Sequence, residues 1–258
     1  MSAGERPGWA TMLARPGLDF GIPTDRGPEM KRFYEERTPC RFLNEDPIVE
    51  GQDEVFYELH RSWLKLNTTT WELAPAVSGF RELRAADANV SEPVRLEDPD
   101  GSAFVLVPPG HDDIDEVGVL IESEDPDRMR EFLAVGMGAE ERPAGQLVGN
   151  TTFAVRPSEP LGDRSPILTR GFTMLTLIVD DLPAVHQHLI DSGGHHGLKP
   201  ARDPAQPERC IYSFVSDPDG NWIELVQFGA TSGPLPTLPG PELTFDEFFA
   251  FRDHGTPA

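Results

Sequence analysis

Short runs of alternating hydrophobic and polar residues dominate the chain and predict strands rather than long helices. The first run begins at Asp19, in "DFGIPTD". It is followed by "GPEMKRFYEER", in which Met30, Phe33 and Tyr34 have helical spacing. Three more strand-like runs come next, near "CRFLNE", "EVFYELH" and "SWLKLNTTT". This part of the chain therefore predicts a strand, a helix and three strands.

The same order of elements recurs further along the chain. In "EVGVLIES", Val117, Val119 and Ile121 share one face of a predicted strand. The helix "DPDRMREFLAVGMG" follows, with Asp125 as its N-cap and glycines at its end, and "GQLVGNTTFAVRPS" supplies two more strands. A last copy consists of the strand "GFTMLTLIVD", the helix "DLPAVHQHLIDSGG" and the hairpin "ERCIYSFVSDPDGNWIELVQF".

A shorter block between these copies, from "GFRELRAAD" to "PVRLEDPDGSAFVLVPPG", leaves too little chain between its strands for a helix. The sequence thus predicts an α+β protein of four repeated units, the second without its helix. Units that pair in chain order would form two similar halves. The predicted organisation is a loose N-terminus at 1–15, an N-terminal domain at 16–111, a C-terminal domain at 112–228 and a Pro/Gly-rich tail with a short helix at 229–258.

Composition supports a folded, acidic protein and narrows its partners. Of 258 residues, 38% are hydrophobic, which is enough for a core. The formal net charge of -22 repels phosphate backbones and anionic membranes, so neither nucleic acid nor a membrane is an expected partner. The N-terminus lacks the apolar core of a signal peptide, and no apolar run has the length of a membrane span. We therefore expect a cytoplasmic protein.

Two features are less informative. Cys40 and Cys210 are too few for a disulfide framework, and neither belongs to a metal-binding pair of cysteines. In the tail, Phe245, Phe248 and Phe249 would lie on one short amphipathic helix. Whether that helix closes a pocket or forms the seam of a homodimer stays open.

One turn occurs twice, as "EDPDGSAFVL" at 97–106 and as "SDPDGNWIEL" at 216–225. A Pro-Asp-Gly β-turn explains both copies, and Pro218 argues against a calcium-binding loop. The strands after the two turns differ at one position, which is Val105 in the first copy and Glu224 in the second. This difference suggests that the second hairpin carries a functional carboxylate.

The repeated strand–helix–strands units, the "RFYEE" helix end, "VDDLPAVHQHLIDSGG" and above all "DPDGNWIEL" resemble the vicinal oxygen chelate superfamily. That superfamily includes glyoxalase I, extradiol dioxygenases and bleomycin-binding proteins. The resemblance spans about residues 19–228 and implies tandem βαβββ modules paired into two half-open barrels. It implies no single activity, because one scaffold carries many unrelated chemistries.

The resemblance also implies a site, residue by residue. Its metal ligands come from the start of the first strand and the middle of the last strand of a unit. Glu224 matches the glutamate ligand, whereas the histidine position of the last unit holds Met174. The histidine position is Glu116 in the third unit, and Asp19 in the first, where Val105 is its partner. The resemblance therefore implies a divalent metal (Mg, Mn, Fe or Zn) held by Glu224 and Glu116 in the C-terminal half.

Other side chains are candidates for the walls of the site. Lys65 shares a strand face with Trp63 and is either a lone cation in the N-terminal barrel or a solvated residue at a strand edge. His195 and His196 are either acid–base groups that reach the barrel or exposed loop residues. The candidate substrate-binding residues are Met174, Thr176, Tyr212, Trp222, His195, His196 and Lys65.

Two functions from different classes stay open. The first is an enzyme of the superfamily that acts on a small organic molecule by isomerisation, epimerisation or lyase chemistry. In it Glu224 is the ligand or general base and Glu116 lies opposite, since two carboxylates in a dry cavity raise each other's pKa. The second is a metal-free small-molecule binding protein like the bleomycin-resistance members, because Met174, Thr176 and Ile178 make the usual ligand strand largely apolar.

Two weaker hypotheses complete the set. An extradiol-type dioxygenase is disfavoured, because Phe214 stands at its tyrosine position and no histidine lies near Gln206. Alternatively, the N-terminal half is purely structural and supports a C-terminal half that binds ligand by itself.

Overall fold

The computed structural model describes residues 12–160, 165–202, 207–229, 234–238 and 240. The first unit comprises β1 (Asp19–Thr24), α1 (Gly27–Arg37), β2 (Arg41–Val49), β3 (Gln52–Leu59) and β4 (Ser62–Thr69). The second comprises β5 (Phe80–Ala86), β6 (Val94–Glu97) and β7 (Ala103–Val107). The third comprises β8 (Val117–Ser123), α2 (Pro126–Glu131), the π-helical turn η2 (Phe132–Gly136), β9 (Glu140–Arg142), β10 (Gly145–Val148) and β11 (Thr151–Pro157). The last comprises β12 (Met174–Ile178), α3 (Leu182–Asp191), β13 (His195–His196), β14 (Ala201–Arg202), β15 (Cys210–Ser216) and β16 (Trp222–Phe228).

The predicted units are present, and the second has strands but no helix, as predicted. Helix α2 also begins as predicted, because the side chain of Asp125 accepts a hydrogen bond from the Arg128 backbone N–H at 3.1 Å. The predicted long helix is shorter, however, since η2 replaces its second half. The α+β class with two mixed sheets is therefore confirmed, and the half-open barrel shape stays a prediction.

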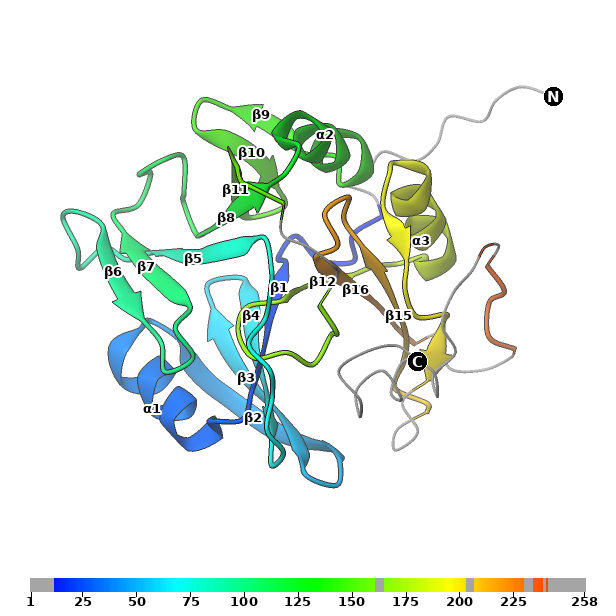
Figure 1. Cartoon of the computed structure of the whole chain (residues 1–258), viewed down its shortest axis with the longest axis horizontal. Coiled ribbons are helices and arrows are strands. Elements are labelled where there is room, and N and C mark those ends of the chain that lie inside the picture. The colour runs from blue at the N-terminus through cyan, green and yellow to red at the C-terminus, as the bar shows by residue number, and fades with distance from the viewer. Residues whose placement is uncertain (1–11, 161–164, 203–206, 230–233, 239, 241–258) are drawn as a thin grey trace.

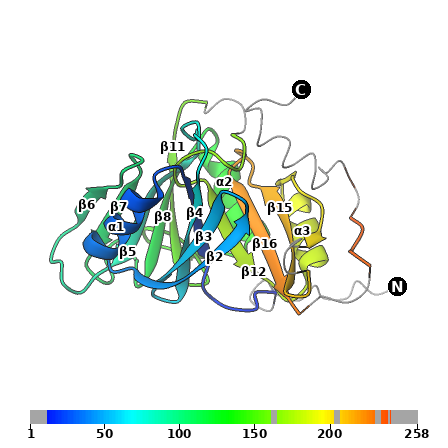
Figure 2. The same cartoon turned by 90° about the horizontal axis from the view of Figure 1, so that it is seen from below.

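The strands form two sheets, and each sheet combines units from both halves of the chain. The nine-stranded first sheet has the order β13-β15-β16-β12-β1-β4-β3-β2, with β14 paired to β15. The seven-stranded second sheet has the order β6-β7-β5-β8-β11-β10-β9. In both views of the molecule β6 and β7 lie at one end and α3 lies at the other (Figure 1, Figure 2).

The prediction that units pair in chain order is wrong. Strand β1 of the first unit is bonded antiparallel to β12 of the last unit, with Asp19 opposite Thr176. In the same way β5 of the second unit is bonded antiparallel to β8 of the third. The sequence pattern did not reveal this, because alternation fixes which face of a strand is buried but not which strand lies beside it.

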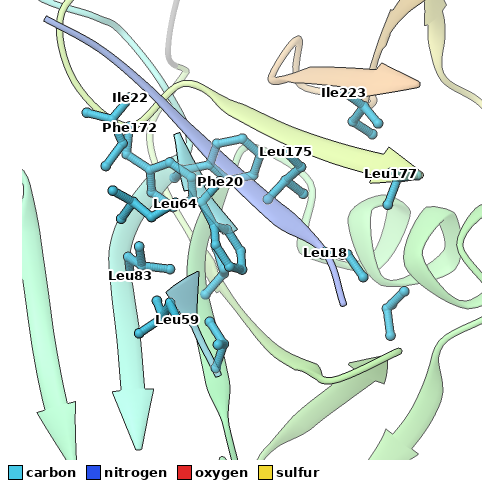
Figure 3. Packing of buried hydrophobic residues seen from close by; sticks show 14 of the residues in the cluster. Leu18, Phe20, Ile22, Leu59, Leu64, Leu83, Phe172, Leu175, Leu177 and Ile223 are labelled. Atoms are coloured by element: carbon cyan, nitrogen blue, oxygen red, sulfur yellow. The ribbon is translucent and has the colours of Figure 1, made fainter. Parts of the chain in front are cut away.

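The faces of the strands are as the alternation predicts. In the first sheet, Leu64 and Leu66 on β4 and Leu175 and Leu177 on β12 are fully or almost fully buried in the main core. Val117, Val119 and Ile121 of β8 belong to the same core, which therefore joins both sheets. Figure 3 shows Leu64 of the first sheet beside Leu83 of the second. The alternate residues of β4 and β12 therefore point to the opposite face of the first sheet, away from the main core.

Both Asp-Pro-Asp-Gly segments are turns, as predicted. Asp217 Oδ1 accepts hydrogen bonds from the backbone N–H groups of Asp219 at 3.0 Å and Asn221 at 2.9 Å. Asp98 Oδ1 accepts the equivalent bonds from Asp100 at 2.9 Å and Ser102 at 2.8 Å. The first aspartate of each copy therefore holds its turn from within, so the repetition is architectural.

The predicted tail helix with Phe245, Phe248 and Phe249 lies outside the described residues. Of the helices within the described ranges, none is long and apolar enough to cross a membrane.

Candidate functional site

A cavity of about 200 Å³ lies on the face of the first sheet that points away from the main core. The alternation that buries Leu64 and Leu66 directs Lys65 of β4 to this cavity, and the same rule directs Thr176 of β12 and Glu224 of β16 there. The first unit supplies one wall and the last unit supplies the other. The pairing of β1 with β12 thus creates the cavity.

Most of the cavity wall is apolar, and aromatic rings stand on both sides of it. On the first unit, Phe56 and Trp63 pack edge to face with ring centroids 5.8 Å apart. On the last unit, Tyr212 and Phe214 pack edge to face at 6.2 Å. Met174 completes this wall. Such walls favour a flat or apolar molecule, because its burial removes apolar surface from water.

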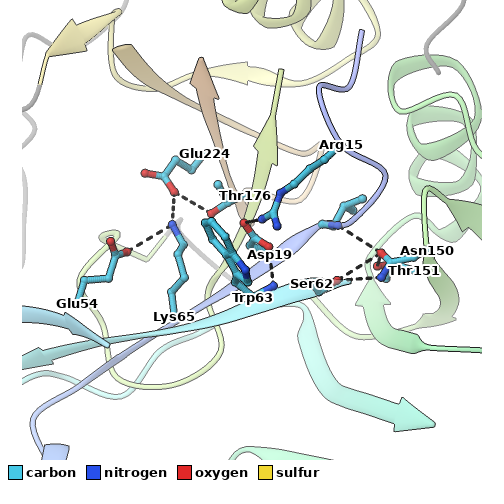
Figure 4. A network of polar contacts seen from close by, with 11 residues as sticks. Arg15, Asp19, Glu54, Ser62, Trp63, Lys65, Asn150, Thr151, Thr176 and Glu224 are labelled. Carbon is cyan, nitrogen blue, oxygen red and sulfur yellow. Dashed lines mark hydrogen bonds and ion pairs between the residues drawn. The ribbon is translucent and has the colours of Figure 1, made fainter. Parts of the chain in front are cut away.

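Four polar residues form a cluster on the cavity wall, here called the Lys65 cluster: Lys65, Glu54, Glu224 and Thr176 (Figure 4). Lys65 Nζ is 2.5 Å from Glu224 Oε2 and 3.4 Å from Glu54 Oε1. Thr176 Oγ1 donates to Glu224 Oε2 at 2.7 Å. The side chain of Lys65 is only 6% exposed, so these charges attract each other through a poorly screened environment.

The Lys65 cluster shifts the pKa values of its members. Burial lowers the pKa of Lys65, but the charges of Glu224 and Glu54 outweigh burial and hold the pKa above its ordinary value. Burial raises the pKa of Glu54, and the charge of Glu224 adds to the rise against the effect of Lys65. Lys65 is therefore a permanent cation at neutral pH, and Glu54 accepts a proton more readily than an ordinary glutamate.

Asp19 lines the same cavity but is engaged by its neighbours. Its Oδ1 accepts a hydrogen bond from the Trp63 backbone N–H at 2.7 Å, and its Oδ2 binds the Arg15 guanidinium. The Arg15 guanidinium carbon also lies 4.1 Å from the centroid of the Trp63 ring, in cation–π contact. Burial raises the pKa of Asp19 to about 6, although Arg15 and Lys65 act in the opposite direction. Asp19 thus ties the segment before β1 to β4.

Glu116 does not lie opposite Glu224, contrary to the prediction. Arg61 Nε donates to Glu116 Oε1 at 2.6 Å, and Asn150 Nδ2 donates to Glu116 Oε2 at 3.0 Å. Burial favours the neutral acid, but the hydrogen bonds from Arg61 and Asn150 outweigh it and lower the pKa of Glu116. These residues line a separate polar cavity of about 180 Å³. The two glutamates are apart because the third unit pairs with the second, not with the last.

The residues present do not fit the metal site that the resemblance implies. Glu224 lacks Glu116 as a partner, and the ammonium group of Lys65 already neutralises it. A divalent cation on Glu224 would therefore face a like charge at close range. Across the described part of the chain, no three His, Cys, Asp or Glu side chains converge as ligands.

The other predicted residues divide into two groups. Lys65, Met174, Thr176 and Tyr212 line the cavity. Trp222 lies behind the wall, where its Nε1 donates to the Ser165 carbonyl at 2.9 Å. His195 and His196 form strand β13 rather than a loop and lie elsewhere. His195 Nε2 lies 3.3 Å from the Pro218 carbonyl, and the His196 ring lies 5.8 Å from the buried ring of His186.

The equivalent face of the second sheet is filled by its own chain. Val105, which replaces the glutamate there, packs in a small cluster with Ala86, Val107 and Ile114. Ile114 comes from the loop between β7 and β8, and its Cδ1 would lie 2.5 Å from a side-chain carbon added at Gly118. Glycine at 118 therefore makes room for this loop residue. Val105 therefore lies on a face of the second sheet that its own chain fills, whereas Glu224 lies on the face of the first sheet that lines the cavity.

Several residues of the cavity were not predicted from the sequence as site residues, among them Glu54, Phe56 and Asn67. The signal was present in part, because the core-facing Val55 and Tyr57 put Glu54 and Phe56 on the other face of β3. The sequence did not show which unit lies opposite this face. The face becomes one wall of a cavity only because the first unit pairs with the last.

Comparison with solved structures finds similar folds at low sequence identity. Glyoxalase I from Zea mays matches with a TM-score of 0.62 and 14% identity, over 84% of this chain and 92% of that chain. The cppA protein from Streptococcus pneumoniae matches with a TM-score of 0.50 and 10% identity, over 84% and 98%. A Bacillus subtilis protein to which a dioxygenase activity is ascribed matches with a TM-score of 0.52 and 11% identity, over 93% and 95%.

No protein-family model and no curated protein sequence matches the chain. The structural matches confirm the resemblance at the level of the fold, which is that of the vicinal oxygen chelate superfamily. At this identity they carry no information about substrate or chemistry.

Proposed function

We propose that the protein binds a small, largely apolar organic molecule in the cavity between its first and last units. The observation that carries this proposal is the cavity itself, with aromatic residues from both units on its walls and a compact polar cluster on one side. A preformed apolar cavity binds such a molecule by removing its surface from water without first having to rearrange.

The proposed binding requires no metal ion. Glu224, the residue that matches the superfamily's glutamate ligand, is satisfied by Lys65 at 2.5 Å and by Thr176 at 2.7 Å. Its role in this proposal is to hold Lys65 in place on the cavity wall. This assignment favours the metal-free binding hypothesis over a metal-dependent enzyme.

The test is a thermal-shift screen of small aromatic and aliphatic fragments with a variant that fills the cavity. Val226 lines the cavity and is 8% exposed, so Val226→Phe places a ring in the space that the ligand would occupy. We expect fragments to raise the unfolding midpoint of the wild-type protein, with the same shift in EDTA, and to lose this effect in Val226→Phe.

The matched control is Val94→Phe, the same substitution at an exposed position of β6 in the second sheet. It should leave the fragment-induced shifts unchanged. Shifts that survive in Val226→Phe, or that disappear with EDTA, would contradict the proposal.

A second candidate is an enzyme that moves a proton on such a molecule, by isomerisation, epimerisation or elimination. Glu54 favours this candidate, because its carboxyl group lines the cavity beside Lys65 and its pKa is raised by burial, as suits a general base. Lys65 would stabilise negative charge that develops on a neighbouring oxygen of the substrate. In this scheme Glu54 takes the role that the sequence assigns to Glu224.

Deuterium incorporation tests the second candidate. A fragment with an acidic C–H bond that binds in the first screen is incubated with the protein in D₂O, and loss of its C–H signal is followed by NMR. An enzyme of this kind should exchange that hydrogen, Glu54→Gln should abolish the exchange, and Asp53→Asn should not. Equal exchange with and without protein would remove this candidate and leave the binding proposal intact.

A further inference from the structure

In the part of the chain that the structure describes, acidic side chains outnumber basic ones at the cavity. Among the described residues, four carboxylates line it, together with one lysine and one arginine. A second arginine reaches one of these carboxylates from outside the cavity wall. Three cations are thus available to pair with four carboxylates, and each cation lies closest to one of them. These ion pairs are Arg15–Asp19, Arg209–Asp46 and Lys65–Glu224.

Glu54 is the carboxylate that this pairing leaves over. Among the described residues its one ion pair is with Lys65, at 3.4 Å, and Lys65 lies closer to Glu224, at 2.5 Å. The Glu54 side chain is 17% exposed and faces the cavity. The charge of Arg209 also lowers the pKa of Glu54, but among the described residues Arg209 forms its ion pair with Asp46, at 3.5 Å. Glu54 is therefore a largely desolvated carboxylate that shares both nearby cations with other carboxylates, which is a costly arrangement unless a further donor is supplied.

The surroundings of Glu54 favour a cationic ligand over an anionic one. An anion in the cavity would meet Lys65 only beside two carboxylates that already share it, and would repel Glu54. A cation would meet an acceptor instead. Phe56, two residues along the same face of β3, and Trp63 beside it present aromatic rings that also attract a cation.

We propose that the molecule bound in this cavity is an organic cation: an ammonium group that donates a hydrogen bond to Glu54, carried on an apolar and preferably aromatic body. The size of the cavity, about 200 Å³, limits that body to little more than one ring with a short chain. This inference rests on the proposed function and narrows it to one chemical class.

Three probes of nearly equal shape but different charge test the inference: phenethylamine as the cation, 2-phenylethanol as the neutral isostere and phenylacetate as the anion. Their dissociation constants for the full-length protein are measured by ligand-observed NMR titration at neutral pH. We expect phenethylamine to bind about tenfold or more tightly than 2-phenylethanol, the gain of a charge-assisted hydrogen bond. Phenylacetate should bind weakest of the three.

The variants Glu54→Gln and Asp53→Asn make the test specific to one carboxylate. Both remove one negative charge from β3, but only Glu54 lines the cavity. Glu54→Gln should reduce the affinity for phenethylamine to about that for 2-phenylethanol, so that the preference for the cation is lost. Asp53→Asn should change neither affinity. Thermal unfolding of each variant confirms that it is folded.

The outcomes separate this inference from the function on which it rests. If 2-phenylethanol or phenylacetate binds as tightly as phenethylamine, or if Glu54→Gln keeps the preference for the cation, the inference is wrong while the binding function stands. If none of the three probes binds, the inference is also wrong. The binding function then falls only if the neutral fragments of the cavity-filling experiment fail as well.

Discussion

Lys65 is the residue on which the geometry of the site depends most. It is a buried cation between two carboxylates, 2.5 Å from Glu224 and 3.4 Å from Glu54. Among the described residues neither glutamate forms an ion pair with another cation, although the charge of Arg209 also lowers the pKa of Glu54. Lys65 therefore offsets much of the cost of burying two carboxylates in this apolar wall.

Substitution of Lys65 by Met should therefore destabilise the protein more than its loss of contacts suggests. Removal of one partner of a buried ion pair leaves an uncompensated charge, and we expect a loss of about 3 kcal/mol in the free energy of unfolding. Urea denaturation at neutral pH measures this loss. The double variant Lys65→Met/Glu224→Gln should recover part of it, because one of the stranded charges is gone.

The same variant should show a pH dependence of known sign. Without Lys65 the folded-state pKa of Glu54 rises further, because the member of the Lys65 cluster that lowers it is gone, so the folded state binds a proton that the unfolded state releases. The stability deficit of Lys65→Met should thus be largest near neutral pH and shrink as the pH falls toward about 5. A deficit that is constant over this range would mean that lost packing, not stranded charge, destabilises the variant.

At the scale of elements, the sequence predicted most of what local rules decide. The alternation of Leu64, Lys65 and Leu66 assigned the correct faces of β4, and the capping aspartate of α2 was identified. The replacement of the second half of that helix by η2 was not, because no residue in "FLAVG" breaks a helix strongly enough to mark the change. Local pattern thus gives faces and caps, while tertiary packing decides how far an element continues.

The site was only half predictable for a related reason. Met174 and Thr176 were expected at the cavity because they lie on the face of their strand that points away from the core. Tyr212 and Trp222 were expected there because they belong to the hairpin that carries Glu224; of these four residues, all but Trp222 line the cavity. The residues on the opposite wall of the cavity depend on which unit pairs with the last one. The alternation of hydrophobic and polar residues within a strand does not show which strand pairs with it. The carboxylate expected opposite Glu224 was consequently Glu116, whereas the structure puts the first unit there.

At the scale of the whole molecule, the pairing of units makes the two halves of the chain interdependent. The first sheet joins β1 to β12, and the second joins β5 to β8, so both sheets cross the boundary between 16–111 and 112–228. The cavity draws its two walls from opposite sides of that boundary. This arrangement opposes the hypothesis that the C-terminal half binds ligand by itself.

Separate expression of residues 1–111 and 112–258 tests the pairing directly. Each fragment alone exposes the edges of β1 and β5 or of β12 and β8, which are hydrogen-bonded to the other fragment in the intact chain. We expect each alone to be unfolded or aggregated and to bind none of the fragments. Co-expressed, they should copurify in equal amounts on a tag carried by one of them and recover binding, because all strand pairs are restored. A folded, monomeric 112–258 that binds phenethylamine would mean that its units pair with each other in solution.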